Sequence, residues 1–143
     1  FQKYNSVSIV IRQHRFSEKL NSINNINKSN IFVKKTIDYI NNATKLIESK
    51  IDNPKFYIFS NDVTNLYNSF DKNKFKFINH NKDKPINDFY LSTLCKHFIV
   101  GPSTFHWWSA YLSKYKNKLC ICPTSDLKFS SNKDIYPDNW IKL

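Results

Sequence analysis

Methionine is absent from the 143-residue chain, and glycine occurs only once, at Gly101. A Gly-rich dinucleotide fingerprint or a P-loop needs several glycines, because the backbone must turn tightly and approach phosphate groups closely. Both motifs are therefore excluded, and any phosphate site must use arginine, hydroxyl groups and helix N–H groups instead. The missing initiator methionine predicts that the chain is a fragment or a processed product.

Long apolar runs are missing as well. No segment approaches the roughly 18 apolar residues that span a bilayer, and no signal peptide opens the chain. We therefore expect a cytoplasmic protein, with any membrane contact peripheral and on the inner face. Three cysteines, an odd number, predict reduced thiols rather than a disulfide framework. The four histidines show no metal-ligand spacing, so we predict no metal.

Acidic residues are few, 11 against 22 lysines and arginines, which gives a net charge of +11. Such a charge is compatible with a nucleic acid, an anionic membrane or an anionic small ligand as partner. The lysines are scattered along a chain rich in Lys, Asn and Ile, the composition that an AT-rich genome produces. No nucleic-acid-binding motif accompanies them, so we predict no nucleic-acid partner. A basic module for nucleic acids or anionic surfaces is left as an alternative that rests on charge alone.

The length suffices for one domain, residues 1–143, with a single core. Short β-branched or aromatic runs alternate with segments of helical spacing. The predicted strands are 7–11, 55–60, 75–78, 98–100 and 119–121, and the predicted helices are 31–49, 63–70, one from Asp88, and 104–114. This alternation indicates a Rossmann-like α/β fold, with a mostly parallel sheet and helices on both faces.

Residues 17–30 are polar and Asn-rich, and we predict a loop there. Within the core we expect three particular side chains, those of Ile37, Ile40 and Trp108. The tail, 134–141, should fold back and bury Tyr136 and Trp140.

Polar loops follow three of the predicted strands, at residues 12–16, 60–62 and 102–104. The carboxyl ends of parallel strands share one edge of a sheet, where ligands bind, so these loops should converge. Ser103 or Thr104 stands where a helix begins, and free N–H groups with the helix dipole favour an anion there. The plainer interpretation is an ordinary strand–helix joint followed by two packed tryptophans.

The segment from Asp88 to Leu112 resembles the last conserved block of the alpha-1,2-fucosyltransferases, glycosyltransferase family 11. That block reads roughly D-x-Y-L-M-S-L-C-K-H, then a strand, then N-S-T-F-S-W-W-A-A-Y-L. The matching residues are Asp88, Tyr90, Leu91, Leu94, Cys95, Lys96, His97, Ser103, Thr104, Phe105, Trp107, Trp108, Ala110, Tyr111 and Leu112. The family's Met, Asn and second Ser are replaced by Ser92, Pro102 and His106.

Further segments are similar to the family in the same order: 32–40, 55–62 and 134–141. Together they cover nearly the whole chain but correspond to only the second half of a family member. The resemblance implies the carboxyl-terminal, donor-binding half of a GT-B enzyme. The amino-terminal, acceptor-side domain is expected to be absent from this chain.

The family's first block, V-S-V-H-I-R-R-G-D-Y, is matched by residues 7–16, with Arg12 at the place of the first arginine. The resemblance implies that Arg12 meets the donor diphosphate, and a guanidinium can grip phosphate oxygens bidentately. The alternative is a surface or structural arginine. The family's His, second Arg, Gly and Asp are replaced by Val10, Gln13, His14 and Arg15. No residue is thereby left to name as catalytic base.

The resemblance also implies that the carboxylate of Asp88 pairs with the guanine edge of a GDP-sugar, although a helix N-cap explains an aspartate there equally well. It places Ser103, Thr104 and the neighbouring Phe105 near the donor. Asp62 matches the second Asp of the family's S-D-D block.

The implied reaction is metal-independent, inverting transfer of L-fucose from GDP-fucose to the 2-hydroxyl of a galactoside in a glycan or surface polysaccharide, with no cofactor. The alternative is a catalytically diverged homologue that binds a nucleotide-sugar or glycan without turnover.

Overall fold

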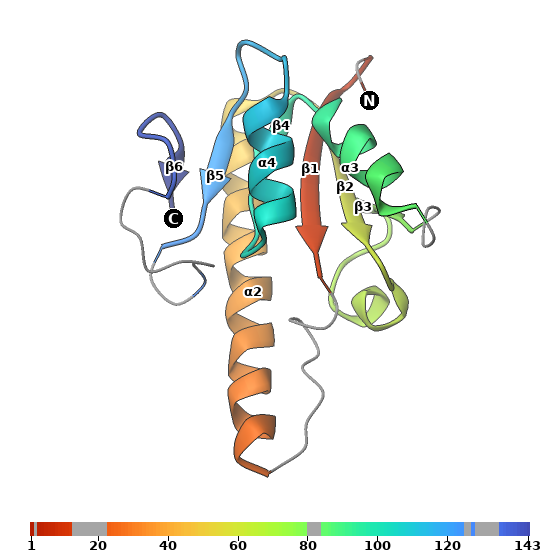
Figure 1. Ribbon diagram of the computed structural model, residues 1–143, viewed down its shortest axis with the longest axis vertical. Helices are drawn as coiled ribbons and strands as arrows, with labels where there is room; N and C mark the ends of the chain where they lie inside the picture. The colour runs from red at the N-terminus through yellow and green to blue at the C-terminus, as the bar shows by residue number, and fades with distance from the viewer. Residues whose placement is uncertain (2, 13–22, 80–83, 125–126, 128–134) are drawn as a thin grey trace.

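The computed structural model describes residues 1, 3–12, 23–79, 84–124, 127 and 135–143 (Figure 1). Its strands are β1 (Asn5–Ile11), β2 (Pro54–Ser60), β3 (Phe75–Ile78), β4 (His97–Ile99), β5 (Cys120–Cys122) and β6 (Ile141–Lys142). Between them lie the helices α2 (Ile23–Lys50), the 3₁₀ helix η1 (Thr64–Asn68), α3 (Pro85–Thr93) and α4 (Thr104–Leu112). None of these helices is long and apolar enough to cross a membrane.

All the strands pair in parallel, in the order β3-β2-β1-β4-β5-β6. Helix α2 covers one face of this sheet, and α3 and α4 cover the other (Figure 1). The predicted Rossmann-like α/β fold is confirmed. Parallel strands covered on both faces are apolar throughout, which explains the short β-branched and aromatic runs in the sequence.

Alternating side chains of each strand build two cores. Val7 and Ile9 of β1 belong to the cluster that contains Ile40 and Ile47 of α2. Val10, one position out of phase, belongs to the cluster on the opposite face, which includes Ala110 of α4. The period of two along a strand therefore separates an α2 face from an α3/α4 face.

Helix α2 begins earlier than the sequence pattern predicted, at Ile23 instead of Ile31. The prediction of a loop is wrong for residues 23–30, and residues 17–22 lie outside the described part. The segment contains neither Gly nor Pro, so a helix anchored further along can extend into it at little cost. The helix ends at Lys50, and Asn53 adopts a positive φ of 47° just before Pro54.

Several other boundaries differ from the predicted ones. Helix α3 starts at Pro85, three residues before Asp88, because the fixed φ of proline suits the first helical position. The segment 63–70 forms a short 3₁₀ helix, and α4 stops at Leu112. The tail buries Tyr136 and Trp140 as predicted, and it adds β6, which the pattern did not indicate.

Trp108 lies outside the core, and the prediction that it is buried is wrong. The inner side of α4 is taken by His106, Ser109 and Ala110, so Trp108 projects from the outer side with half of its surface exposed. Its neighbour Trp107 packs inward and donates its indole N–H to the carbonyl of Ile135 at 2.7 Å. Ile40 is buried as predicted, and Ile37 is partly buried against the α2-side core.

The hydroxyl of Tyr39 fastens α2 to the ends of two strands. It lies 2.9 Å from the carbonyl oxygen of Val100 and 3.0 Å from that of Ile121. Burial raises the pKa of Tyr39 well above its ordinary value, which keeps the hydroxyl protonated and able to donate.

Replacing Tyr39→Phe should lower the free energy of unfolding by about 1–2 kcal/mol, because the buried hydroxyl donor that the carbonyl groups of Val100 and Ile121 share is lost. Chemical denaturation of both proteins measures this difference. The control is Tyr67→Phe, which removes a hydroxyl from an exposed ring and should change stability little. Equal stability of the Tyr39 variant and the unmodified protein would contradict the prediction.

Candidate functional site

The sheet reverses its winding direction between β1 and β4. From β1 the chain continues through α2 to β2 on one side, whereas β4 leads through α4 to β5 on the other. Such a switch point opens a crevice at the carboxyl ends of the strands, because the connections on either side of it diverge. A cavity of about 610 Å³ lies at this edge.

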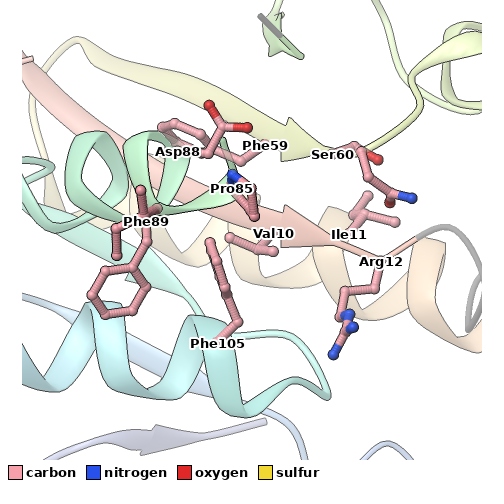
Figure 2. Close-up of a pocket in the computed structure, with 11 residues that line it drawn as sticks. Val10, Ile11, Arg12, Phe59, Ser60, Pro85, Asp88, Phe89 and Phe105 are labelled. Carbon is pink, nitrogen blue, oxygen red and sulfur yellow. The ribbon is translucent and has the colours of Figure 1, made fainter. Parts of the chain in front are cut away.

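Three parts of the fold line the cavity: the ends of β1 and β2, the first half of α3, and the start of α4 (Figure 2). Its walls are mostly apolar, and the rings of Phe89 and Phe105 meet edge to face with centroids 5.1 Å apart. The described residues of the lining are Val10, Ile11, Arg12, Phe59, Ser60, Asn61, Pro85, Ile86, Asp88, Phe89 and Phe105.

The two charged groups among the described lining residues stand apart. Figure 2 shows the carboxylate of Asp88 and the guanidinium of Arg12 toward different ends of the cavity, with Pro85 and Val10 between them in this view. The cavity therefore offers a cation at one end, an anion at the other and apolar walls between. This arrangement suits an elongated ligand that carries phosphate at one end and N–H donors at the other.

Arg12 and Ser103 share a second, small cavity of about 20 Å³ next to the first. Ser103 is the residue before α4, yet its hydroxyl makes no capping hydrogen bond. The hydroxyl is also buried without a partner among the described residues. A buried hydroxyl without a hydrogen bond costs about 1–3 kcal/mol, so a ligand oxygen that reaches it would relieve that cost.

The sequence-predicted residues are only partly brought together. Arg12, Asp88 and Phe105 line the main cavity, and Ser103 lies beside Arg12 in the small one. Thr104 is exposed at the first position of α4 and lines neither cavity.

Asp62 also lies outside both linings. Its Oδ1 accepts hydrogen bonds from the backbone N–H of Thr64 at 2.9 Å and from the Thr64 hydroxyl at 2.6 Å. It therefore shapes the turn that follows β2. The interpretation of Asp88 as a helix N-cap is wrong, because α3 begins at Pro85 and Asp88 sits in its first turn.

Sequence reasoning missed most of the apolar wall, including Phe59, Ile86 and Phe89. These residues come from a strand and a helix whose apolar positions also serve packing, so no motif distinguishes them. Asn61 and Ser60, in one of the predicted polar loops, do line the cavity.

Gly101 is the point at which the loop after β4 touches β1. A Cβ at this position would lie 2.8 Å from the carbonyl oxygen of Val10, closer than real Cβ contacts allow. The single glycine of the chain thus permits the loop to approach β1, and that approach brings Ser103 beside Arg12.

His106 holds the same loop from behind. The backbone N–H of Gly101 donates to His106 Nδ1 at 3.2 Å, so Nε2 carries the proton and donates to Ser8 Oγ at 3.2 Å. Ser8 then donates to Ser92 Oγ at 2.8 Å, and Ser92 donates to Ser109 Oγ at 3.0 Å. Ser109 completes the circuit by donating to the carbonyl of His106 at 2.9 Å. Every donor in the chain of bonds finds an acceptor.

This network joins β1, α3 and α4 behind the cavity. His106 is fully buried, and burial lowers its pKa to about 3. A neutral imidazole with both nitrogens engaged is a structural support and not a general base. The signal in the sequence was the departure from the serine found at this position in the resembling block.

His97, the other histidine in the described residues, lies at the start of β4 and accepts the N–H of Leu119 at 3.1 Å. Burial lowers its pKa as well, and it lines neither cavity. Among the described residues, no three His, Cys, Asp or Glu side chains gather to hold a metal ion. The absence of a metal stays a prediction.

A parallel sheet with a charged cavity at its switch point is the arrangement of nucleotide-binding α/β domains. The chain matches the model of glycosyl transferase family 11 over residues 2–143, and it belongs to that family. Curated relatives include the O-antigen biosynthesis glycosyltransferase WbnK of Escherichia coli, 27% identical over 75% of this chain and 36% of the relative. An alpha-1,2-colitosyltransferase of Escherichia coli is 25% identical over 97% of this chain and 48% of the relative.

The chain thus spans about half, or less, of the length of these relatives. No solved structure matches it significantly.

The buried neutral His106 predicts a pH dependence of folding. Its folded pKa lies below the ordinary value of 6.5, so the unfolded chain takes up a proton between pH 6.5 and about 3 that the folded chain does not. The stabilisation is complete above pH 6.5 and is lost as the pH falls toward 3. At pH 4.5 the loss should reach about 2–3 kcal/mol.

His106→Gln and His106→Asn should lower stability at pH 7 but flatten its decline with acid, because no imidazole remains to be protonated. Denaturant unfolding between pH 7 and 4.5 measures both slopes. His97 is present in all three proteins, so its own contribution cancels in the comparison. If the stability of all three proteins declined with acid at the same slope, the pKa of His106 would not be lowered by folding, and the prediction would be wrong.

Proposed function

We propose that the chain is a GDP-sugar-binding domain that serves transfer of L-fucose from GDP-fucose to the 2-hydroxyl of a galactoside-containing glycan. The observation that carries the proposal is the placement of Arg12 and Asp88 toward different ends of one apolar-walled cavity at the switch point. Membership of glycosyl transferase family 11 supports a sugar nucleotide as the ligand class.

Each group has a chemical task in this proposal. The guanidinium of Arg12 grips the diphosphate bidentately and stabilises charge as the diphosphate leaves. The unpartnered hydroxyl of Ser103 and the first N–H groups of α4 add donors on the same side. At the other end, the carboxylate of Asp88 accepts two N–H groups of guanine, which adenine cannot supply. Phe105 and Phe89 give the base and ribose apolar walls.

The transferred sugar and the acceptor are less constrained than the nucleotide. One relative is named for transfer of colitose rather than fucose, so a related deoxy sugar is a natural competitor in any donor screen. The described residues that line the cavity include no histidine, and the base that takes the acceptor's proton is left unassigned.

A diverged, binding-only homologue is the second candidate function, and Val10 favours it. Val10 stands where the resembling block has a histidine, and its buried side chain forms part of the cavity wall. An isopropyl group cannot accept a proton, so substrate binding could persist where turnover is lost.

Nucleotide preference tests the two charged residues separately. Calorimetry should show GDP binding more tightly than ADP and UDP without added Mg²⁺. Asp88→Asn should weaken the binding of GDP by tenfold or more and leave the affinity for ADP almost unchanged, because only guanine loses its hydrogen-bond acceptor. Arg12→Gln should weaken all three diphosphates by similar factors, because every one of them presents the same phosphates.

Asp38→Asn, an exposed carboxylate on α2, is the matched control and should alter none of these affinities. Equal, weak binding of all nucleotides that falls with salt would assign the affinity to general lysine electrostatics and would refute the donor site.

Activity should be low in the chain as it stands. It covers about half of its relatives' length, and its first block replaces charged or titratable residues with Val10 and Gln13. Loss of one electrostatic partner commonly costs about a hundredfold in rate. Mass-spectrometric detection of fucosylated galactoside should therefore find slow transfer or none.

Gln13→Arg with Arg15→Asp should raise turnover in a protein that also carries an acceptor domain. No gain in such a folded protein would mean that the loop serves another donor or another role. Rapid fucosylation by the 143-residue chain itself would contradict the prediction directly.

A further inference from the structure

The outer surface of α4 and the end of α3 expose an unusual set of large side chains. We call them the aromatic face; its members are Tyr90 (62% exposed), Trp108 (49%), Tyr111 (52%), Leu112 (53%) and Tyr115 (37%). Tyr and Trp side chains are usually buried in the core, or they lie at an interface where one end of the ring is in an apolar environment and the other is hydrated. Half-exposed, they form a surface that a partner can cover.

The members of the aromatic face lie next to one another. Trp108 and Tyr111 have ring centroids 5.9 Å apart, and Leu112 follows Trp108 by one helical turn. Leu112, Tyr90 and Tyr115 then line a common hollow of about 570 Å³. No residue that the structure describes lines both this hollow and the 610 Å³ cavity, so a partner that covers the aromatic face leaves the candidate site open.

The segment of the chain that follows Asp88 and carries the aromatic face is basic. The chain carries no acidic residue between Asp88 and Asp126, while Lys96, Lys114, Lys116 and Lys118 fall in that interval. Lys96 and Lys114 line the hollow, and Lys116 is exposed beside them. Lys118 instead donates to the last carbonyl groups of α4, which is a favourable place for a cation.

We propose that the aromatic face docks the protein onto an anionic lipid bilayer. Tyrosine and tryptophan rings favour the headgroup level, where one edge is apolar and the other is hydrated. Leu112 supplies a side chain that enters the acyl region, and the lysines meet lipid phosphates. The described residues that line the hollow include no carboxylate, which would repel an anionic surface.

The charge around the aromatic face also favours a lipid bilayer over two other partners, a second copy of the chain and a nucleic acid. A second copy of the chain would place the lysines of two aromatic faces against each other, which is unfavourable. A nucleic acid would be expected to meet arginine, but both arginines of the chain, Arg12 and Arg15, lie elsewhere in the sequence. A lipid surface satisfies the apolar and the cationic parts together.

Vesicle co-sedimentation tests the proposal. The chain should bind vesicles that contain phosphatidylglycerol and phosphatidylcholine, bind pure phosphatidylcholine at least tenfold more weakly, and detach as salt rises. Leu112→Gln should weaken binding several-fold, and Lys114→Gln with Lys116→Gln should weaken it roughly tenfold or more. All three positions are exposed, and circular dichroism verifies that each variant is folded.

Matched controls come from α2, on the other face of the sheet (Figure 1). Ile31→Gln removes an equally exposed apolar side chain, and Lys34→Gln with Lys45→Gln removes two exposed lysines. Neither control should change vesicle binding by more than about twofold, and nucleotide binding at the candidate site should be unaffected by every variant.

Three results would overturn the proposal. The first is no binding to anionic vesicles. The second is equal weakening by the α2 controls, which would reduce the effect to net charge. The third is a dimer in solution that Leu112→Gln dissociates, which would assign the aromatic face to a second copy.

Discussion

The parallel pairing of β1 with β4 places the two halves of the candidate site beside each other. Arg12 directly follows the one strand, and the loop with Ser103 follows the other. The contact is close enough that only glycine fits at position 101, because the carbonyl of Val10 occupies the space that a Cβ would need. The hydrogen-bond network of His106 and three serines ties β1 to the loop after β4 at Gly101, so the strand pairing and the loop conformation support each other.

The two faces of the sheet are stabilised in different ways. The α2 face is an apolar core, with the hydroxyl of Tyr39 as its fastening point to the strand ends. The α3/α4 face combines apolar packing with the buried polar network and carries Asp88 and Phe105 into the cavity. Apolar packing tolerates small shifts, whereas a satisfied hydrogen-bond network fixes atoms in place. The side of the sheet that must position ligand groups is also the side with the network.

The altered first block has a structural consequence at Val10. Its side chain is buried and lines both cavities, so the change from a histidine places an alkyl group where the resembling block has a titratable one. Arg12, two residues later, keeps its place at the cavity. The first block therefore keeps its cationic residue at the cavity, Arg12, and has an alkyl side chain, that of Val10, in place of a titratable one.

Local patterns were sufficient for the sheet and most of its helices. Period-two and helical spacing located β1, β2, β3 and α4 to within a few residues. Polar residues directly after strands, Arg12 after β1 and Ser60 with Asn61 at the end of β2, indicated the edge of the sheet where the cavity lies. The predicted starts of α2 and α3 were wrong because the local sequence signals there were weak. The Asn-rich start of α2 has poor intrinsic helix propensity but no breaking residue, and Pro85 began α3 earlier than the apolar spacing suggested.

The sequence by itself therefore determined the α/β class and the family, because the apolar periods and the order of the motifs can be read locally, and it singled out three residues that line one cavity, Arg12, Asp88 and Phe105. Only the tertiary structure decided that Asp62 shapes a turn, that Trp108 faces outward and that His106 is a neutral support. Those outcomes depend on which helix face meets the sheet and on which hydrogen-bond partners arrive from distant segments. Ser8 and His106, which are hydrogen-bonded to each other, lie 98 positions apart along the chain. Their network with Ser92 and Ser109 exists only once β1, α3 and α4 are packed together.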